Sequence, residues 1–222
     1  MSQIEIKNLC KYYGQDHTIV KAVDDISMNI EQGEFVVILG PSGSGKSTFV
    51  KMIGGLDLAD SGEIVVNGEN ILQYSPDRLA QYRSETIGFV FQSFQLLPNL
   101  TVKENIEMPV YIDEKIPDES YVKELLEQLE LYEMQDRLPA QLSGGQQQRV
   151  AIARALINKP DIILADEPTG NLDGSTSERV VALLMNMCKK YGSTLIFITH
   201  NEEISKKADR VIRITDGMIN ER

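Results

Sequence analysis

Several residue types and patterns are scarce in this sequence, and their scarcity excludes several classes of protein. Only 2 cysteines occur among 222 residues. Cys10 and Cys188 stand far apart without a metal-type spacing, so we expect reduced thiols, as in a cytosolic protein. No apolar run approaches the roughly 18–20 residues of a membrane span, which predicts no direct insertion into lipid. Residues 1–7 alternate polar and apolar side chains, as a strand does, and do not resemble a secretion signal.

Positive charge is also in short supply. The chain has 22 lysines and arginines against 33 aspartates and glutamates, a formal net charge of −11. Proteins that bind nucleic acid or anionic lipid headgroups need clustered basic residues, and no dense basic run occurs here. We therefore expect no nucleic-acid partner. The length suits one large domain or two small ones, with enough apolar residues for a core.

The sequence does contain a glycine-rich segment, Gly40–Thr48, that fits the pattern G-x-x-x-x-G-K-[ST]. It follows an apolar run, Phe35–Leu39, and we expect a helix to start near Lys46. Such a loop turns successive N–H groups toward an anion, and the helix adds the positive end of its dipole. In this pattern Lys46 reaches the β- and γ-phosphates and the Ser47 hydroxyl ligates Mg²⁺. The predicted nucleotide-binding residues are Gly40, Pro41, Ser42, Gly43, Ser44, Gly45, Lys46, Ser47 and Thr48.

Three further apolar runs end on polar residues suited to chemistry. Continuous apolar runs of four or five residues are typical of strands buried on both faces. Open α/β sheets bind their ligands at the carboxyl ends of such strands, so we expect the polar residues to meet Lys46 at one sheet edge. The runs with the residues that follow them are Ile87–Phe91 with Gln92, Ile162–Ala165 with Asp166 and Glu167, and Leu195–Ile198 with Thr199 and His200.

Asp166 and Glu167 are adjacent carboxylates at the end of a predicted strand. Because neighbours on an extended chain point to opposite sides, we expect them to have different roles. Asp166 is placed to hold Mg²⁺, directly or through water. Glu167 could orient and deprotonate an attacking water. Alone, Asp-Glu-Pro would indicate a solvated acidic turn, but the upstream strand and the phosphate loop favour the catalytic interpretation.

Leu142–Gln146, with the sequence Leu-Ser-Gly-Gly-Gln, has the features of a second anion site at a helix start. Ser143 is the predicted N-cap of a helix that runs to about Asn158, and the paired glycines allow the backbone to approach an anion closely. One nucleotide does not need two such helix starts, and neither does a small phosphotransferase. We therefore expect Ser143, Gly144, Gly145 and Gln146 to contact ATP held by a second copy of the chain, in a head-to-tail dimer.

Other segments carry clear local signals. Apolar residues at helical spacing predict helices over 122–129 and 180–188, the second with a capping box formed by Ser175 and Glu178. The first 35 residues and Gly62–Asn70 are typical of hairpins, with Asn67-Gly68 as a type I′ turn. The stretch 93–160 interrupts the alternation of strand and helix, so we interpret it as a helical subdomain.

Together these segments resemble the ATP-binding subunit of ABC transporters, over essentially the full length of the chain. By this resemblance 40–48 is the Walker A loop and 162–166 is the Walker B strand. Leu142–Gln146 is the family signature, which binds ATP in trans. The resemblance implies ATP hydrolysis with ATP and Mg²⁺ as cofactors, and a homodimer that forms on ATP binding.

The resemblance also implies a catalytic group and a metal site. Glu167 is the catalytic base, and His200 is the switch histidine that contacts the γ-phosphate. Gln92 is the Q-loop residue, which touches Mg²⁺ and faces a transmembrane partner. The implied Mg²⁺ ligands are Ser47, Gln92 and Asp166.

Two further roles follow from the resemblance. Asn171 and Asp173 belong to the D-loop, which crosses the dimer interface. Tyr13 matches the aromatic residue that stacks on adenine, and the adjoining Tyr12 is the alternative.

The fold expected is α/β: a P-loop NTPase core of the RecA type with a mainly parallel sheet, an N-terminal antiparallel β subdomain and an inserted helical subdomain. The whole chain, 1–222, forms one such domain. Its core spans 1–92 and 161–222, and the helical subdomain spans 93–160.

Finer features point to one branch of the family. Ile87–Gln92, Leu96–Pro98 and Thr169–Asp173 resemble members that serve macrolide export, lipoprotein release and antimicrobial-peptide resistance. The chain ends at Arg222 without the membrane domain that macrolide exporters carry, so we expect a separate transmembrane permease subunit. The protein would then be cytoplasmic and peripheral on the inner face of the cell membrane. A mechanotransmitting ATPase that regulates a membrane complex without transport, as in cell division, is the alternative.

Overall fold

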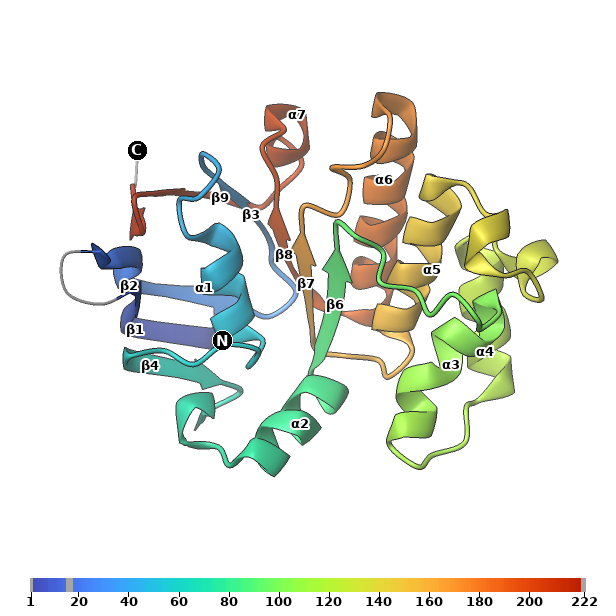
Figure 1. Cartoon of the computed structure of the whole chain (residues 1–222), viewed down its shortest axis with the longest axis horizontal. Coiled ribbons are helices and arrows are strands. Elements are labelled where there is room, and N and C mark those ends of the chain that lie inside the picture. Colours follow the sequence, from blue (N-terminus) through green and yellow to red (C-terminus); the bar gives the residue numbers. More distant parts are fainter. Residues whose placement is uncertain (1, 15–17, 221–222) are drawn as a thin grey trace.

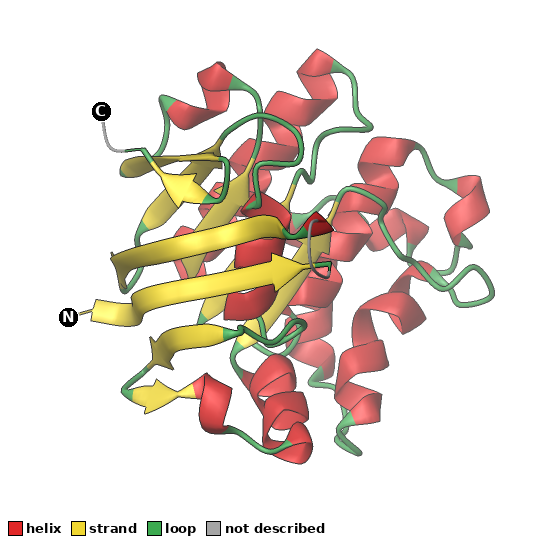
Figure 2. Cartoon of the chain, turned by 60° about the vertical axis from the view of Figure 1, so that its left-hand side comes forward, coloured by secondary structure: helices red, strands yellow, loops and turns green. Residues whose placement is uncertain are grey.

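Two β-sheets and the helices packed around them make up the structure (Figure 1). The computed structural model describes residues 2–14 and 18–220. A four-stranded sheet has the strand order β2-β1-β4-β5, and a six-stranded sheet has the order β10-β9-β3-β8-β7-β6. Figure 2 looks onto the long strands of the four-stranded sheet, with a helix visible behind them.

The four-stranded sheet is antiparallel throughout. The predicted hairpins are confirmed, and the turn between the last two strands has φ of 51° at Asn67 and 86° at Gly68. Both angles are positive, as a type I′ turn requires. The strands are β1 (Ser2–Tyr13), β2 (Val20–Glu31), β4 (Ser61–Val66) and β5 (Glu69–Asn70).

The six-stranded sheet is parallel except for its edge strand β10. Every residue of β3 and β8 is buried, as is every residue of β7 except its last. The continuous apolar runs therefore predicted doubly covered strands correctly. The strands are β3 (Phe35–Leu39), β6 (Ile87–Phe91), β7 (Ile162–Asp166), β8 (Thr194–Ile198), β9 (Arg210–Thr215) and β10 (Met218–Ile219).

The helices lie mainly on the far side of the six-stranded sheet from the four-stranded one, with α3 and α4 outermost (Figure 1). In the described part of the chain, none of them has the length and apolar character that crossing a bilayer requires. They are α1 (Lys46–Ile53), α2 (Pro76–Glu85), α3 (Val102–Ile112), α4 (Glu119–Gln128), α5 (Gly144–Leu156), α6 (Gly174–Tyr191) and α7 (Glu202–Ser205), with 3-10 turns at Ile71–Gln73, Tyr132–Met134 and Pro139–Gln141.

The core has one apolar cluster on each face of the six-stranded sheet. Alternate residues of a strand enter opposite clusters, as the pleat requires. In β3, Val36 and Ile38 pack with α1 and the four-stranded sheet. Val37 and Leu39 pack with side chains of α3 to α6. The parallel strands are thereby held between two layers, and their carboxyl ends form a fixed edge.

Helices α3, α4 and α5 fall within 93–160, the range assigned from the sequence to a helical subdomain. Their apolar side chains share one cluster with the sheet residues Val90, Ile163 and Phe197. Among the described residues these helices have no core separate from that of the sheet, so the division into subdomains stays a prediction.

The predicted capping box of α6 is wrong. The helix begins at Gly174, and Asp173 is its N-cap, accepting a hydrogen bond of 3.0 Å from the main-chain N of Thr176. Ser175 lies in the first turn and donates its hydroxyl to the same carboxylate. A charged acceptor at 173 satisfies these donors, so the N-cap lies two residues before the predicted one. Cys10 and Cys188 are free thiols, the second of them buried.

Candidate nucleotide-binding site

The polar residues predicted to meet at one sheet edge do so. Phe91 is paired with Asp166, Asp166 with Ile198, and Ile198 with Ile38, so four strands end side by side. A cavity of about 830 Å³ opens beyond these ends. Its lining includes Ser42, Ser47, Gln92, Asp166, Glu167 and Asn171.

The glycine loop after β3 fits between neighbouring backbones so closely that side chains are excluded. A Cβ at Gly40 would lie 2.0 Å from the carbonyl oxygen of Ile214, and one at Gly45 would lie 1.8 Å from that of Ala22. Gly45 has φ of 99° and caps α1, a conformation that glycine adopts without strain. The loop is therefore shaped by its surroundings before any ligand arrives.

Lys46 is buried at the mouth of this loop, with 6% of its surface exposed. Its ammonium donates to the carbonyl oxygens of Gly40 at 3.0 Å and Pro41 at 2.7 Å. Those bonds hold a positive charge in the loop next to the first N–H groups of α1, which have no partner within the helix. The buried hydroxyl of Ser44 has no hydrogen-bond partner among the described residues. The Lys46 ammonium, the N–H groups at the start of α1 and the unpaired Ser44 hydroxyl together form a site that suits a phosphate group.

Ser47 and Asp166 join α1 to the end of β7. The Ser47 hydroxyl donates to Oδ1 of Asp166 at 2.9 Å. Within the described residues, no cluster of three or more His, Cys, Asp or Glu could hold a metal unaided. Mg²⁺ is commonly bound by one or two carboxylates with waters and substrate phosphates supplying the remaining ligands. The sparse set of Ser47, Gln92 and Asp166 fits that mode.

The sequence predicted that Glu167 continues the extended strand of Asp166 and points to its opposite side, and this prediction is wrong. Its φ is 46°, in the left-handed region, so it does not continue the extended strand. Its side-chain direction is set by a turn and not by strand alternation. The Glu167 main-chain N donates to the carbonyl of Ile198 at 3.1 Å, which holds the turn against β8. Oε2 of Glu167 lies 3.9 Å from Nδ1 of His200.

Tyr12 and Tyr13 are neighbours at the end of β1, and their hydroxyls have different partners. The Tyr12 hydroxyl donates to Asp24 at 2.6 Å. The Tyr13 hydroxyl donates to Asp57 and also interacts with the side chain of Thr48, in the first turn of α1. Tyr13 therefore lies on the side of the glycine loop, which favours it as the adenine contact.

The signature segment forms a separate surface. Ser143 caps α5, and the Ser143 and Gln146 side chains bond each other's main-chain N in a capping box. A Cβ at Gly145 would lie 2.4 Å from the Thr176 methyl, and one at Gly144 would lie 3.4 Å from Leu172. The segment thus packs on the start of α6. None of residues 143–146 lines the cavity at the glycine loop.

Asp173 acts within the chain as the α6 cap. The main-chain N–H of Thr176, followed by the side chains of Thr176 and Ser175, lowers the pKa of Asp173 to about 2. Its place at a dimer interface stays a prediction, as does that of Asn171.

Sequence reasoning missed Arg154. Its guanidinium donates to the carbonyl oxygens of Gln95 at 2.6 Å and Phe94 at 2.9 Å. These bonds tie the segment after Gln92 to α5. Main-chain carbonyls have no sequence signature, so only the position of Arg154 in an otherwise apolar stretch of α5 could have drawn attention to it.

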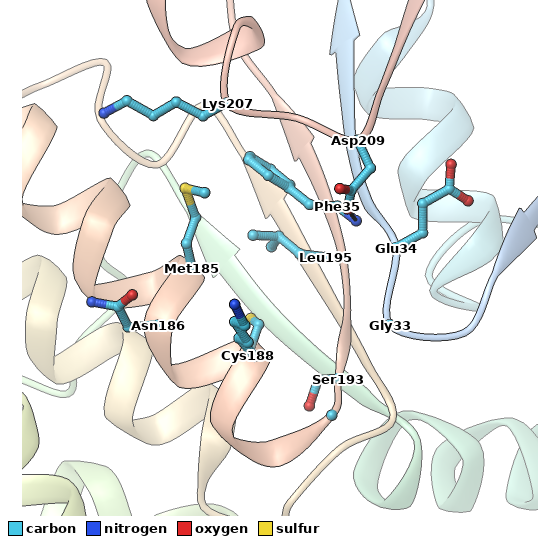
Figure 3. Close-up of a pocket in the computed structure, with 12 residues that line it drawn as sticks. Gly33, Glu34, Phe35, Met185, Asn186, Cys188, Ser193, Leu195, Lys207 and Asp209 are labelled. Atoms are coloured by element: carbon cyan, nitrogen blue, oxygen red, sulfur yellow. Dashed lines mark hydrogen bonds between the residues drawn. The ribbon is translucent and has the colours of Figure 1, made fainter.

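A different cavity, of about 530 Å³, lies at the opposite edge of the sheet (Figure 3). It surrounds the first residues of β3 and β8, with Phe35 and Met185 facing each other across it. None of the predicted site residues lines this cavity.

Comparisons with known proteins agree with this geometry. Residues 23–170 match the family model described as ABC transporter. The chain is 46% identical over 218 residues to the macrolide export ATP-binding/permease protein MacB of Hyphomonas neptunium, covering 97% of this chain and 34% of that protein. It is 39% identical over 218 residues to the lipoprotein-releasing system ATP-binding protein LolD of Shewanella frigidimarina, covering 97% and 91%.

A solved structure resembles the whole fold. The ATP-binding cassette MJ0796 of Methanocaldococcus jannaschii, a dimer bound to ADP and Pi, matches with a TM-score of 0.89 and 40% identity. The match covers 98% of this chain and 97% of that one. The chain spans about a third of the length of the MacB relative. On the family model and these relatives, the chain belongs to the ABC transporter family, as an ATP-binding cassette.

Proposed function

We propose that this chain binds ATP with Mg²⁺, hydrolyses it, and uses the reaction to power a separate transmembrane subunit. One observation carries the chemical part of this proposal. A hydroxyl, an amide and two carboxylates line one cavity at the ends of parallel strands, beside a loop that holds a buried lysine. That arrangement suits phosphoryl transfer, in which catalysis depends mainly on positioning and charge.

The loop binds the triphosphate. Lys46 and the first N–H groups of α1 neutralise phosphate oxygens, and the Ser44 hydroxyl has a free donor for one of them. Tyr13, on the loop side of β1, stacks on the adenine. Thr48 completes the loop at the start of α1.

Ser47, Gln92 and Asp166 would hold Mg²⁺, which would supply positive charge against the phosphate oxygens of ATP. Glu167 accepts the proton of the attacking water, and His200 stands beside it to contact the γ-phosphate. A main-chain hydrogen bond from Glu167 to Ile198 of β8 keeps this carboxylate at the edge of the site.

A second copy of the chain completes each site. Ser143, Gly144, Gly145 and Gln146 form a helix start of the kind that binds anions, yet they do not line the cavity of their own chain. In a head-to-tail homodimer this helix start faces the ATP of the partner. The related MJ0796 cassette is a dimer in its ADP and Pi complex, which supports the proposal.

A membrane subunit docks beside α3. Tyr111, Ile112 and Ile116 are 55%, 69% and 92% exposed. Earlier in α3, Met108 and Pro109 line a cavity of about 240 Å³ against β6. Exposed apolar side chains that gather on one part of a surface are typical of a protein interface. Through this contact the ATPase would lie on the inner face of the cell membrane. The names of MacB and LolD make export or lipoprotein release the activity to examine first.

The test of the chemistry is the release of phosphate from ATP by the purified chain with no acceptor present. We expect Lys46→Ala to abolish it and the exposed Lys206→Ala to leave it unchanged. Phosphate release that needs an added acceptor, or that survives Lys46→Ala, would contradict the proposal. For docking, a membrane protein retained from detergent-solubilised membranes by the wild type should be lost when Ile112 and Ile116 are both changed to Glu.

A further inference from the structure

We propose that Gly170 and Asn171, together named the Gln92 seat, fix the orientation of the Gln92 amide so that its oxygen faces the Mg²⁺ position. Asn171 is then a positioning residue that acts through Gln92. This role differs from the interface contact predicted for it from the sequence. The inference rests on the proposed function, because it takes Gln92 as a Mg²⁺ ligand.

Two hydrogen bonds join Asn171 to Gln92, and their chemistry leaves one arrangement of both amides. Nδ2 of Asn171 donates to the main-chain carbonyl of Gln92 at 3.1 Å. A carbonyl only accepts, so Asn171 must turn its nitrogen toward that atom and its oxygen the other way. Oδ1 of Asn171 then accepts from Nε2 of Gln92 at 3.2 Å. This bond orients the Gln92 side chain as well. Its Nε2 is directed at Asn171, and its Oε1 remains available to accept a hydrogen bond or to bind a cation.

The orientation matters because the oxygen of an amide attracts a cation and its NH₂ group repels one. Oε1 has lone pairs that can ligate Mg²⁺, whereas the NH₂ group presents two donors and no acceptor. Gln92 is exposed, and its terminal torsion has two roughly equivalent positions. Without a partner it would offer either end to the cavity that it shares with Ser47 and Asp166. Hydrogen bonds outside the ligand shell commonly orient metal ligands in this way.

Gly170 forms the floor of the seat. A Cβ there would lie 2.6 Å from Nε2, 2.9 Å from Cδ and 3.3 Å from Cγ of Gln92, and these are the three nearest atoms. Gly170 is not among the glycines with positive φ, so alanine at this position strains no backbone. The clash is with a flexible side chain. Gly170→Ala therefore displaces Gln92 and leaves the surrounding fold in place.

The seat belongs to the same turn as the predicted catalytic carboxylate. The main-chain N of Gly170 donates to the carbonyl of Glu167 at 3.0 Å, and that of Leu172 donates to Thr169 at 3.1 Å. This turn links β7 to α6. One hydrogen-bonded turn thus carries both Glu167 and the group that orients Gln92, so the position of the turn sets both together.

Equilibrium binding of a non-hydrolysable ATP analogue, measured with Mg²⁺ and in EDTA, tests the seat. In the wild type, Mg²⁺ should tighten binding. We expect Asn171→Ala and Gly170→Ala each to reduce that gain by about tenfold, while binding in EDTA stays as in the wild type. The two variants disturb Gln92 by different means, one by lost hydrogen bonds and one by a clash, so agreement between them does not depend on either one folding perfectly.

Two controls isolate the route through Gln92. Asn186→Ala makes the same substitution at an exposed position of α6, lining the cavity at the opposite sheet edge, and should leave the Mg²⁺ gain unchanged. In a Gln92→Ala background, neither seat variant should change the gain any further, because the amide that they orient is gone.

The outcomes separate this inference from the proposed function. A wild type that gains no affinity from Mg²⁺ would contradict the proposed function and the seat with it. A wild type with a normal gain that both seat variants retain would overturn the seat alone. So would a loss that persists in the Gln92→Ala background, or one that appears only as weaker dimerisation, since that would leave Asn171 with an interface role.

Discussion

Nδ1 of His200 lies 3.9 Å from Oε2 of Glu167, across the carboxyl ends of the neighbouring strands β8 and β7. The side chains are 75% and 32% exposed, so the pair borders the open site and is not part of the core. A proton taken from a water in this corner has a carboxylate to receive it and an imidazole beside that carboxylate. This geometry makes Glu167 the first residue to test.

Glu167→Gln should separate binding from hydrolysis. The amide keeps the size of the side chain but accepts a proton poorly, so we expect ATP binding and dimerisation to persist. The rate of phosphate release at saturating ATP should fall by about 10²- to 10⁴-fold, the usual contribution of a general base. Glu203→Gln, on the exposed start of α7, is the matched control and should hydrolyse ATP normally. A normal rate in Glu167→Gln would remove this residue from its role.

The adenine contact can be assigned by comparing two adjacent substitutions. The Tyr13 side chain interacts with Thr48 at the end of the glycine loop, whereas the Tyr12 hydroxyl bonds Asp24. An aromatic side chain stacked on a base contributes about 1–3 kcal/mol. We therefore expect Tyr13→Ala to weaken ATP binding roughly 5- to 150-fold, and Tyr12→Ala to change it little. Equilibrium binding measures both, and equal losses would contradict the assignment.

The composite site predicts that two inactive chains restore activity when mixed. Lys46→Ala removes the loop cation from one chain, and Ser143→Arg places a bulky side chain at the helix start of the other. In a mixed dimer the intact loop of the second chain faces the intact signature of the first, so one site is whole. We expect each variant alone to be inactive and the mixture to release phosphate.

Protein concentration provides an independent check of the same site. If the site is shared, the specific activity of the wild type rises with concentration as dimers form. A flat response down to nanomolar protein, with no gain on mixing the two variants, would show that each chain works alone. Circular dichroism of Ser143→Arg confirms that the loss of the α5 cap has not unfolded the chain.

The positions where the strands end could be predicted, because a strand buried on both faces is a continuous apolar run in the sequence. A strand such as β8 must be apolar at every position, and the chain becomes polar where it leaves the sheet. Parallel pairing then brings the strand ends together without further information. The Asn67-Gly68 turn could also be predicted, because a type I′ turn needs two consecutive positive φ angles and Asn-Gly is the pair that adopts them most readily.

Three other features could not be predicted from the sequence. Ser175 with Glu178 and Asp173 with Thr176 are both plausible helix starts, and the turn before α6 decides between them. Glu167 looks like the next residue of a strand until its φ of 46° is known. The bonds between Asn171 and Gln92 join residues 79 positions apart, one of them through a main-chain carbonyl. No local pattern encodes such a contact.

The charge at the α6 cap gives a prediction about pH. Hydrogen bonds led by the main-chain N–H of Thr176 lower the pKa of Asp173 from 3.8 to about 2. Because the folded value lies below the unfolded one, the ionised carboxylate stabilises the fold fully above pH 3.8, and this contribution is lost as the pH falls toward 2.

Urea unfolding of the wild type, Asp173→Asn and Asp173→Ala measures that contribution. Asparagine keeps a cap acceptor without the charge, so the wild type should unfold at higher urea than Asp173→Asn near neutral pH. The difference should shrink steadily below about pH 4. Asp173→Ala lacks the acceptor and should stay below Asp173→Asn at every pH. A difference between wild type and Asp173→Asn that persists undiminished to the acid limit would show that the charge does not act through this cap.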